Sequence, residues 1–238
     1  MTDPKDRSTI NINLKKVPAW LFIMIGVLVI SHIVGQIEKY VFNHSTVFGL
    51  VPFFDLGNEK NLPTFFQMMI LFFASAQLLL CYRISQNLND SKKAYWIILS
   101  IGFFYMGMDE WFVLHEKTNQ FVRDLINVKF MNSVHFPWVV LGLIVVVLST
   151  AFFYGFLKKL DKKIRRLLIL AAVLYITGSI GFEMIGGLYI DMVGADNLVY
   201  ALLTACEETL EMVGVVVMIK GILGYLAEET VSIVIKPQ

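Results

Sequence analysis

The stretch Met108-Asp109-Glu110-Trp111-Phe112-Val113-Leu114-His115-Glu116 carries three carboxylates and an imidazole at the end of a segment that is otherwise apolar enough to cross a bilayer. In one continuous helix, Asp109 and Glu116 are seven residues apart and share a face, with His115 beside Glu116. A charged side chain in a membrane helix costs roughly 2.5 to 3.5 kcal/mol on insertion scales, so acids retained there indicate a functional site. The stretch therefore predicts a membrane helix with a site at one end.

The composition of the whole chain agrees with a membrane location. Of its 238 residues, 57% are hydrophobic and only 16% are charged, and the mean hydropathy is +0.67. These values are typical of a polytopic membrane protein rather than of a soluble domain. The formal net charge is +1 and the basic residues lie in short connections, which argues against nucleic acid as a partner.

Six apolar runs are long enough to cross a hydrocarbon core of about 30 Å, which takes about 20 helical residues. They are Val17 to Lys39, Pro63 to Arg83, Ala94 to Glu116, Pro137 to Leu157, Leu167 to Ile190 and Leu198 to Lys220. We therefore predict an all-α fold, a polytopic membrane helix bundle with six transmembrane helices. Residues 1–16 are the predicted N-terminal segment in the cytoplasm, residues 17–226 the transmembrane domain, and residues 227–238 a cytoplasmic tail.

The basic residues set the predicted orientation of the bundle. Lysines and arginines gather before the first run, after the second, and between the fourth and the fifth. By the positive-inside rule these connections lie in the cytoplasm, which places both termini there and fits an even number of spans. The acids of the third, fifth and sixth runs then lie in the outer half of the bilayer or near its middle.

The outer connection between the third and fourth runs has helical periodicity. Phe121, Leu125, Val128 and Met131 recur at helical spacing between Lys117 and Phe136. We therefore predict a short amphipathic helix that lies on the outer surface of the membrane.

Two further runs contain acids. Glu183 interrupts a glycine-rich run, and Cys206-Glu207-Glu208-Thr209-Leu210-Glu211 places Glu207 and Glu211 one turn apart in the last run. None of the six runs carries lysine or arginine away from its ends. The acids must then be neutralised by a bound cation, by protonation, or by a hydrated cavity.

We favour a bound metal among these three solutions. Carboxylates and imidazole are ligands of zinc, iron and manganese, calcium prefers oxygen ligands, and helix bundles also build dinuclear carboxylate centres. A divalent cation or a di-metal centre fits the pattern, and the sequence does not distinguish these four metals. The predicted metal ligands are Asp109, His115, Glu116, Glu183, Glu207 and Glu211. Glu110 and Glu208 point off the shared faces, and either is a candidate general base.

The first run and the loop after it complete the predicted site. His32 and Gln36 are one turn apart in the first run, and residues 54–64, FDLGNEKNLPT, are rich in turn formers and oxygen ligands. The loop could cover the site, so we predict substrate contacts from His32, Gln36, Asp55 and Glu59. The simpler interpretation of Asn61 is an N-cap for a helix that starts with a proline.

The order and spacing of these motifs resemble those of a widespread group of uncharacterised bacterial polytopic membrane proteins. The matching residues are Phe54-Asp55-Leu56 with Glu59, Asn61, Leu62, Pro63 and Thr64, then Asp109-Glu110 with His115-Glu116, then Glu207-Glu208 with Glu211-Met212 and Gly214. Gly57 departs from the pattern, because relatives often have a second aspartate there. The resemblance implies one shared polar site in a bacterial cytoplasmic (inner) membrane and names no reaction. With the orientation above, the site faces the periplasm.

Three classes of function remain open. The first is a membrane-embedded metal-dependent enzyme whose outward-facing carboxylate and histidine site acts on a lipid or lipid-linked substrate. The second is a transporter, channel or sensor that binds protons or divalent cations, although the inner halves of the runs are mostly Leu, Ile, Val and Phe. The third is a non-catalytic subunit of a membrane complex in which protonated acids join helices. The sequence leaves open a homo-oligomer and partner proteins of a membrane complex.

Overall fold

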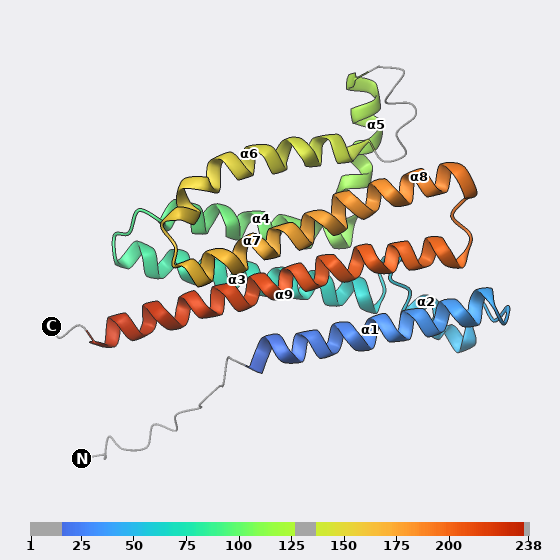
Figure 1. The fold of residues 1–238 in the computed structure, drawn as a ribbon, viewed down its shortest axis with the longest axis horizontal. Coiled ribbons are helices and arrows are strands. Elements are labelled where there is room, and N and C mark those ends of the chain that lie inside the picture. Colours follow the sequence, from blue (N-terminus) through green and yellow to red (C-terminus); the bar gives the residue numbers. More distant parts are fainter. Residues whose placement is uncertain (1–15, 127–136, 236–238) are drawn as a thin grey trace, which may run out of the picture.

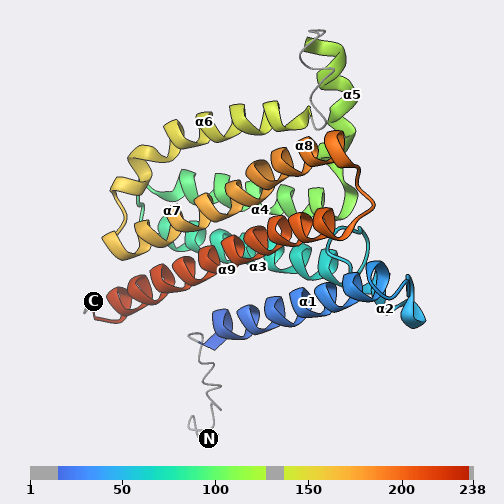
Figure 2. The same cartoon turned by 45° about the vertical axis from the view of Figure 1, so that its right-hand side comes forward.

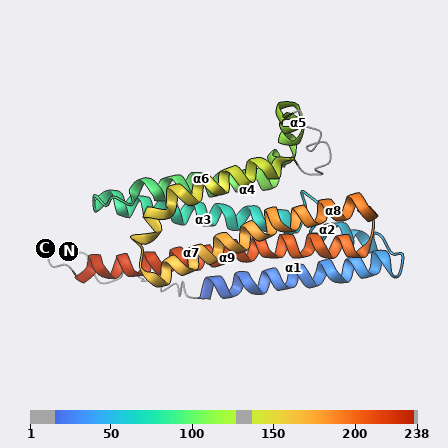
Figure 3. The same ribbon diagram turned by 45° about the horizontal axis from the view of Figure 1, so that its top comes forward.

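The computed structural model describes residues 16–126 and 137–235, and every regular element within these ranges is a helix. The all-α prediction is therefore confirmed for this part of the chain. The long helices run side by side as a bundle, and their connections gather at its two ends (Figures 1 and 2). α1 begins and α9 ends at the same end of the bundle (Figure 3).

The helices follow one another in an order close to that predicted. They are α1 (Val17–Tyr40), η2 (Val47–Gly49), α2 (Leu50–Phe53), α3 (Leu62–Asn87), α4 (Lys93–Phe112), α5 (Leu114–Ile126), α6 (Trp138–Lys158), α7 (Lys162–Ile176), η4 (Thr177–Phe182), α8 (Glu183–Val193) and α9 (Leu198–Ile235). The segment η4 is a π-helical turn that joins α7 and α8 into one rod. α9 continues to Ile235, so most of the predicted tail extends the last helix.

Among the described residues, five helices are long and apolar enough to cross a membrane. They are Val17–Tyr40, Leu62–Asn87, Trp138–Lys158, Lys162–Val193 and Leu198–Glu229. α4 has 20 residues, with Lys93 at its start and Asp109 and Glu110 near its end, and is not among these five. Large apolar side chains also face outward, for example Trp20 at 64% exposure and Val147 at 67%. These features together indicate a membrane protein.

The local sequence explains where several helices begin. Pro18 and Pro63 lie in the first turns of α1 and α3, where a missing N–H removes no helical hydrogen bond. Asn61 caps α3, because its Oδ1 accepts a hydrogen bond from the Thr64 N–H at 3.2 Å. Asp161 caps α7 in the same way, with the Lys163 N–H as donor at 2.7 Å.

The predicted continuous helix from Ala94 to Glu116 is wrong. α4 ends at Phe112, and Val113 adopts the left-handed backbone conformation with φ 53° and ψ 49°. The carboxylate of Asp109 accepts a hydrogen bond from the N–H of His115, in the first turn of α5, at 2.7 Å, so Asp109 caps α5. α5 consequently runs across the direction of the long helices (Figures 1 and 2). Asp109 and Glu116 therefore do not share a helix face.

α5 corresponds in sequence to the first part of the predicted amphipathic surface helix. Phe121 is 61% exposed, whereas its neighbour Val122 is completely buried. The helix begins at Leu114, three residues before the predicted segment. Val128 and Met131, on which the prediction also depended, lie outside the described residues.

α9 packs against α1, α3, α7, η4 and α8. Glycines permit the closest of these approaches. A Cβ at Gly178 of η4 would lie 2.7 Å from the carbonyl oxygen of Glu207, and a Cβ at Gly214 of α9 would lie 2.9 Å from the backbone nitrogen of Tyr175. Only glycine fits at either position without displacement, so the rod of α7, η4 and α8 lies directly on α9. This contact sets Glu183 opposite the acids of α9.

Candidate functional site

A cavity of about 200 Å³ lies among α4, α5, η4, α8 and α9, beneath the loop that precedes α3. Eight of the residues that line it are acids, and they come from the loop and from four helices. They are Glu59, Asp109, Glu110, Glu116, Glu183, Glu207, Glu208 and Glu211. His115 also lines the cavity, and the described lining residues include no lysine or arginine. We call this space the acid cavity.

The acid cavity brings together all the residues predicted as metal ligands or as general bases. Glu110 and Glu208 belong to its lining, although helix geometry had placed both off the shared faces. Of the four predicted substrate contacts, Glu59 lines the acid cavity. His32, Gln36 and Asp55 are not among its lining residues, and His32 and Gln36 are each only 1% exposed.

Uncharged polar residues of the lining were missed from the sequence. Ser179 and Tyr175 line the cavity one and two turns before Glu183, respectively, and Tyr200 and Thr204 line it before Glu207. Both sets continue the helical spacing of the acids, so a search for any polar residue at that spacing would have found them. Trp138, at the start of α6, has no comparable signal in the sequence.

His115 and Asp109 form an oriented pair at the wall of the cavity. His115 Nδ1 donates to Asp109 Oδ2 at 2.9 Å, and the same carboxylate accepts the backbone N–H of His115 at 2.7 Å. The imidazole lies against Trp138, with 4.9 Å between ring centroids, and Trp138 Nε1 donates to Glu183 Oε1 at 3.2 Å. Because Nδ1 is engaged, Nε2 is the ring nitrogen left for a metal or a substrate. Asp109 therefore positions His115.

Gln67 of α3 links two acids from different helices. Its Nε2 donates to Glu110 Oε2 at 3.2 Å and to Glu211 Oε2 at 3.0 Å. The side chain is 1% exposed, and its Oε1 has no hydrogen-bond partner among the described residues. An amide NH₂ with two carboxylate acceptors holds both acids in fixed orientations. Gln67 was missed in the sequence because a single glutamine in an apolar run gives no pattern.

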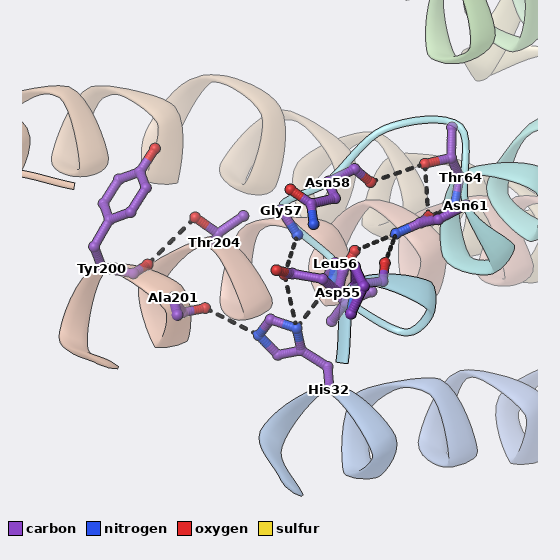
Figure 4. A network of polar contacts seen from close by, with 11 residues as sticks. His32, Asp55, Leu56, Gly57, Asn58, Asn61, Thr64, Tyr200, Ala201 and Thr204 are labelled. Carbon is purple, nitrogen blue, oxygen red and sulfur yellow. Dashed lines mark hydrogen bonds and ion pairs between the residues drawn. The ribbon is translucent and has the colours of Figure 1, made fainter. Parts of the chain in front are cut away.

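A polar network fixes the loop that covers the acid cavity (Figure 4). His32 Nδ1 accepts the N–H of Leu56 at 2.9 Å, and His32 Nε2 lies 3.2 Å from the carbonyl oxygen of Ala201. In a neutral ring these two contacts require the proton on Nε2, which then donates to Ala201. Asp55 Oδ1 lies 3.3 Å from Nδ1, a contact that becomes an ion pair when the ring gains a proton. His32 thus joins α1, the loop and α9.

The loop is also held by its own side chains. Asp55 Oδ1 accepts the N–H of Gly57 at 3.1 Å, and Asn61 Nδ2 donates to the carbonyl oxygen of Asp55 at 2.6 Å. Burial alone would raise the pKa of Asp55, but contact with the His32 imidazole and the Gly57 N–H outweighs burial and lowers the pKa. Leu56, which lines the cavity, is 4% exposed. His32 and Asp55 therefore position the loop over the cavity.

Glu59 differs from the other acids of the cavity because it lies in the loop, and like Glu116 it is exposed. Burial of part of the side chain raises the pKa of Glu59, and the negative charge of Glu116 raises this pKa further. Glu59 and Glu116 are therefore close enough for the charge of one to act on the other.

A protein-family model described as a domain of unknown function (DUF8692) matches residues 20–225. The chain belongs to the DUF8692 family. The match includes every residue that lines the acid cavity, from Leu56 to Glu211, so the cavity is part of the DUF8692 domain. Neither a search of the curated proteins nor a search of the solved structures found a match.

Within the described part of this DUF8692 domain, no group of three or more His, Cys, Asp or Glu residues is close enough to hold a metal ion. The acids surround a space without meeting at one point. A directly liganded metal, as the sequence predicted, is therefore not supported by this arrangement. The acid cavity is instead large enough for several waters, since one water occupies about 30 Å³ of liquid.

Proposed function

We propose that this protein is a membrane-embedded, cation-dependent enzyme whose acid cavity acts on a lipid or lipid-linked substrate. The observation that supports it most strongly is the pairing of His115 with Asp109 in the wall of a cavity that eight acids line. A carboxylate that orients an imidazole is the usual support of a metal-bound or proton-transferring histidine. Acids that only join helices need no such pair.

The proposed cation is divalent and is held partly through water. Carboxylates of Glu116, Glu183, Glu207 and Glu211 supply the negative charge, and His115 supplies one nitrogen through Nε2. Calcium and manganese suit oxygen-rich sites, and zinc or iron suits the histidine. Water in the coordination shell would allow a cation to be held by acids that do not converge on one point.

Hydrolysis is the reaction that these groups suit best. A cation held by these residues would supply polarisation of an ester or phosphoryl oxygen and a lowered pKa of water. Glu110 and Glu208 line the same cavity, and either accepts a proton from the attacking water. Gln67 holds Glu110 at a fixed orientation through the 3.2 Å hydrogen bond. Tyr175, Ser179 and Tyr200 offer hydroxyl groups for contact with substrate.

The proposed topology has six transmembrane helices, in which α4 joins the five long apolar helices as a further span. α4 packs along α3, and its 20 residues as a helix reach about 30 Å, the thickness of a hydrocarbon core. An even number of spans returns both termini to one side, which the basic residues identify as the cytoplasm. The acid cavity then lies in the outer half of the bilayer. In a bacterial cytoplasmic membrane, which the motif resemblance implies, it faces the periplasm.

Elemental analysis of the purified protein tests this proposal. The protein is prepared in nanodiscs without chelator, beside the double variant Glu207→Gln, Glu211→Gln and the control Glu228→Gln. Glu228 is an exposed acid of the same helix, far from the cavity. We expect about one divalent cation per chain in the wild type and in the control, and a loss of cation in the double variant. A wild-type protein without stoichiometric cation, or a double variant that retains it, contradicts the proposal.

A second candidate function is the transport of protons or cations. Polar side chains are buried beyond the acid cavity, between α3 and α4: Ser75 Oγ donates to the Ser100 carbonyl oxygen at 2.8 Å, and Ser100 Oγ donates to that of Ser75 at 2.9 Å. Gln77 is 7% exposed, and both polar atoms of its side chain lack a partner among the described residues. Proton flux is measured in proteoliposomes with a pH-sensitive dye, for the wild type and for Gln77→Leu. Flux by the wild type that is lost in Gln77→Leu favours transport over the enzyme. Flux equal to that of empty vesicles excludes it.

A further inference from the structure

A second hollow, an open groove of about 660 Å³, lies beside the acid cavity. It runs between α2, the loop before α3, the start of α3 and the end of α4. We call it the interfacial groove. Its volume is within the range of about 300 to 1,000 Å³ that is common for sites that bind small ligands.

One wall of the interfacial groove is aromatic. Phe53, Phe65 and Trp111 line it, and the rings of Phe65 and Trp111 are in edge-to-face contact with 6.4 Å between centroids. Phe53 and Phe65 are each 47% exposed, and Phe48, just before α2, is fully exposed. Exposed aromatic side chains at the end of a membrane bundle are typical of the interface between lipid and water. This wall suits acyl chains or the glycerol region of a lipid.

The other part of the groove is polar and carries one positive and one negative charge. Asn58, Glu59 and Lys60 line it, and Lys60 is the only lysine or arginine among its described lining residues. A lysine ammonium is a common binding group for phosphate. The groove thus combines an apolar wall and a cation, as a lipid with an anionic head requires.

The interfacial groove and the acid cavity share a wall. Asn58 and Glu59 line both of them. A head group held at Lys60 is therefore separated from the acid cavity only by these loop residues. An anion moved toward eight acids is repelled unless a cation balances them, so the cation of the proposed function and Lys60 would attract the same head group.

We propose that the interfacial groove binds the substrate as a membrane lipid with a phosphate-bearing anionic head, with its phosphate at Lys60 and its apolar part against Phe53, Phe65 and Trp111. This inference rests on the proposed function for the chemistry that follows binding. It extends that function by naming the substrate class and the side from which the lipid approaches.

Lipid binding by the full chain tests the inference. Native mass spectrometry measures the binding of phosphatidic acid and of phosphatidylcholine of equal chain length to the wild type, Lys60→Gln and Lys117→Gln. Lys117 is an exposed lysine of α5 that does not line the groove, so it is a matched control. Lys60 is exposed, as Lys117 is, so neither substitution should prevent folding, and thermal unfolding of both variants checks this. Inorganic phosphate is a third probe, which separates a lipid head from free phosphate.

We expect the wild type and Lys117→Gln to prefer phosphatidic acid by at least about tenfold, as one charge-assisted contact implies, and Lys60→Gln to lose this preference. Equal binding of the two lipids by the wild type, an unchanged preference in Lys60→Gln, or tighter binding of inorganic phosphate than of phosphatidic acid overturns the inference. Cation content, measured on the same samples, separates the two proposals. Retained cation without lipid preference refutes the groove alone, whereas absent cation refutes the proposed function.

Discussion

Replacement of Gly178 by alanine should destabilise the protein and disturb the acid cavity together. A Cβ at Gly178 would lie 2.7 Å from the carbonyl oxygen of Glu207 and 2.9 Å from Cγ of Glu211. Ordinary contacts of a Cβ begin near 3.4 Å, so η4 would have to move about 0.7 Å away from α9 at its closest point. Overpacking of this kind costs about 1 to 3 kcal/mol, and the added helix propensity of alanine offsets about 0.5 to 1 kcal/mol of that.

The net loss that we expect for Gly178→Ala is about 1 to 2 kcal/mol, which corresponds to a fall in Tm of roughly 2 to 8 °C for a chain of this size. Gly181→Ala is the matched control, because it lies in the same π-helical turn and its Cβ would meet nothing closer than 3.8 Å. Differential scanning fluorimetry in nanodiscs compares the two variants. If Gly178→Ala is as stable as Gly181→Ala and retains the wild-type cation content, the close contact of η4 with α9 is not as described.

The remaining predictions concern the loop network and the His115 pair. His32→Ala leaves the buried Leu56 N–H without its partner, at a cost of about 1 to 3 kcal/mol, and removes the part-buried contact with the Ala201 carbonyl. Hydrogen exchange of residues 54–61 should therefore accelerate, and unchanged exchange contradicts the role of His32 in positioning the loop. The lowered pKa of Asp55 means that its stabilising contribution is fully present above the pKa of an unfolded aspartate, about 3.9, and is lost as the pH falls below this value toward the folded pKa. The difference in Tm between the wild type and Asp55→Asn should therefore shrink as the pH falls from about 5 toward 3, and a difference that grows over this range has the wrong sign. Asp109→Asn should weaken Mn²⁺ binding by about 10- to 100-fold with little change in Tm, as is usual for a carboxylate that orients a histidine ligand. Equal Mn²⁺ affinity of the wild type and Asp109→Asn contradicts the role of Asp109 in orienting His115.

The apolar runs predict the helices well because a membrane helix satisfies its own backbone hydrogen bonds and needs only sufficient apolar length. The acids predict the site for a related reason. Uncompensated charges in apolar helices are stable only where they face one another, a cation or water, so acids from separate runs were expected to share one space. Glu183 and the acids of α9 meet this expectation through the close packing at Gly178.

Other features depend on contacts that a single sequence does not reveal. The helix break at Val113 has no glycine or proline to mark it, and the capping of α5 by Asp109 decides it. Helix faces were also hard to predict, because side chains that face lipid and side chains that face the core are equally apolar. Glu110 was therefore placed off the shared face, although it lines the cavity. His32 is polar and buried, and its partners lie in a loop and in the last helix.

Electron paramagnetic resonance of Mn²⁺ added to the protein in nanodiscs is the most direct test of a hydrated cation in the acid cavity. We expect about one bound Mn²⁺ per chain, with modulation of the echo by water protons and by one imidazole nitrogen. This nitrogen is Nε2 of His115, whose ring is held in place by Asp109. Replacement of His115 by alanine should remove the nitrogen modulation and leave that of the water. A spectrum of free hydrated Mn²⁺ in the presence of the folded wild type would contradict a cation site in this cavity.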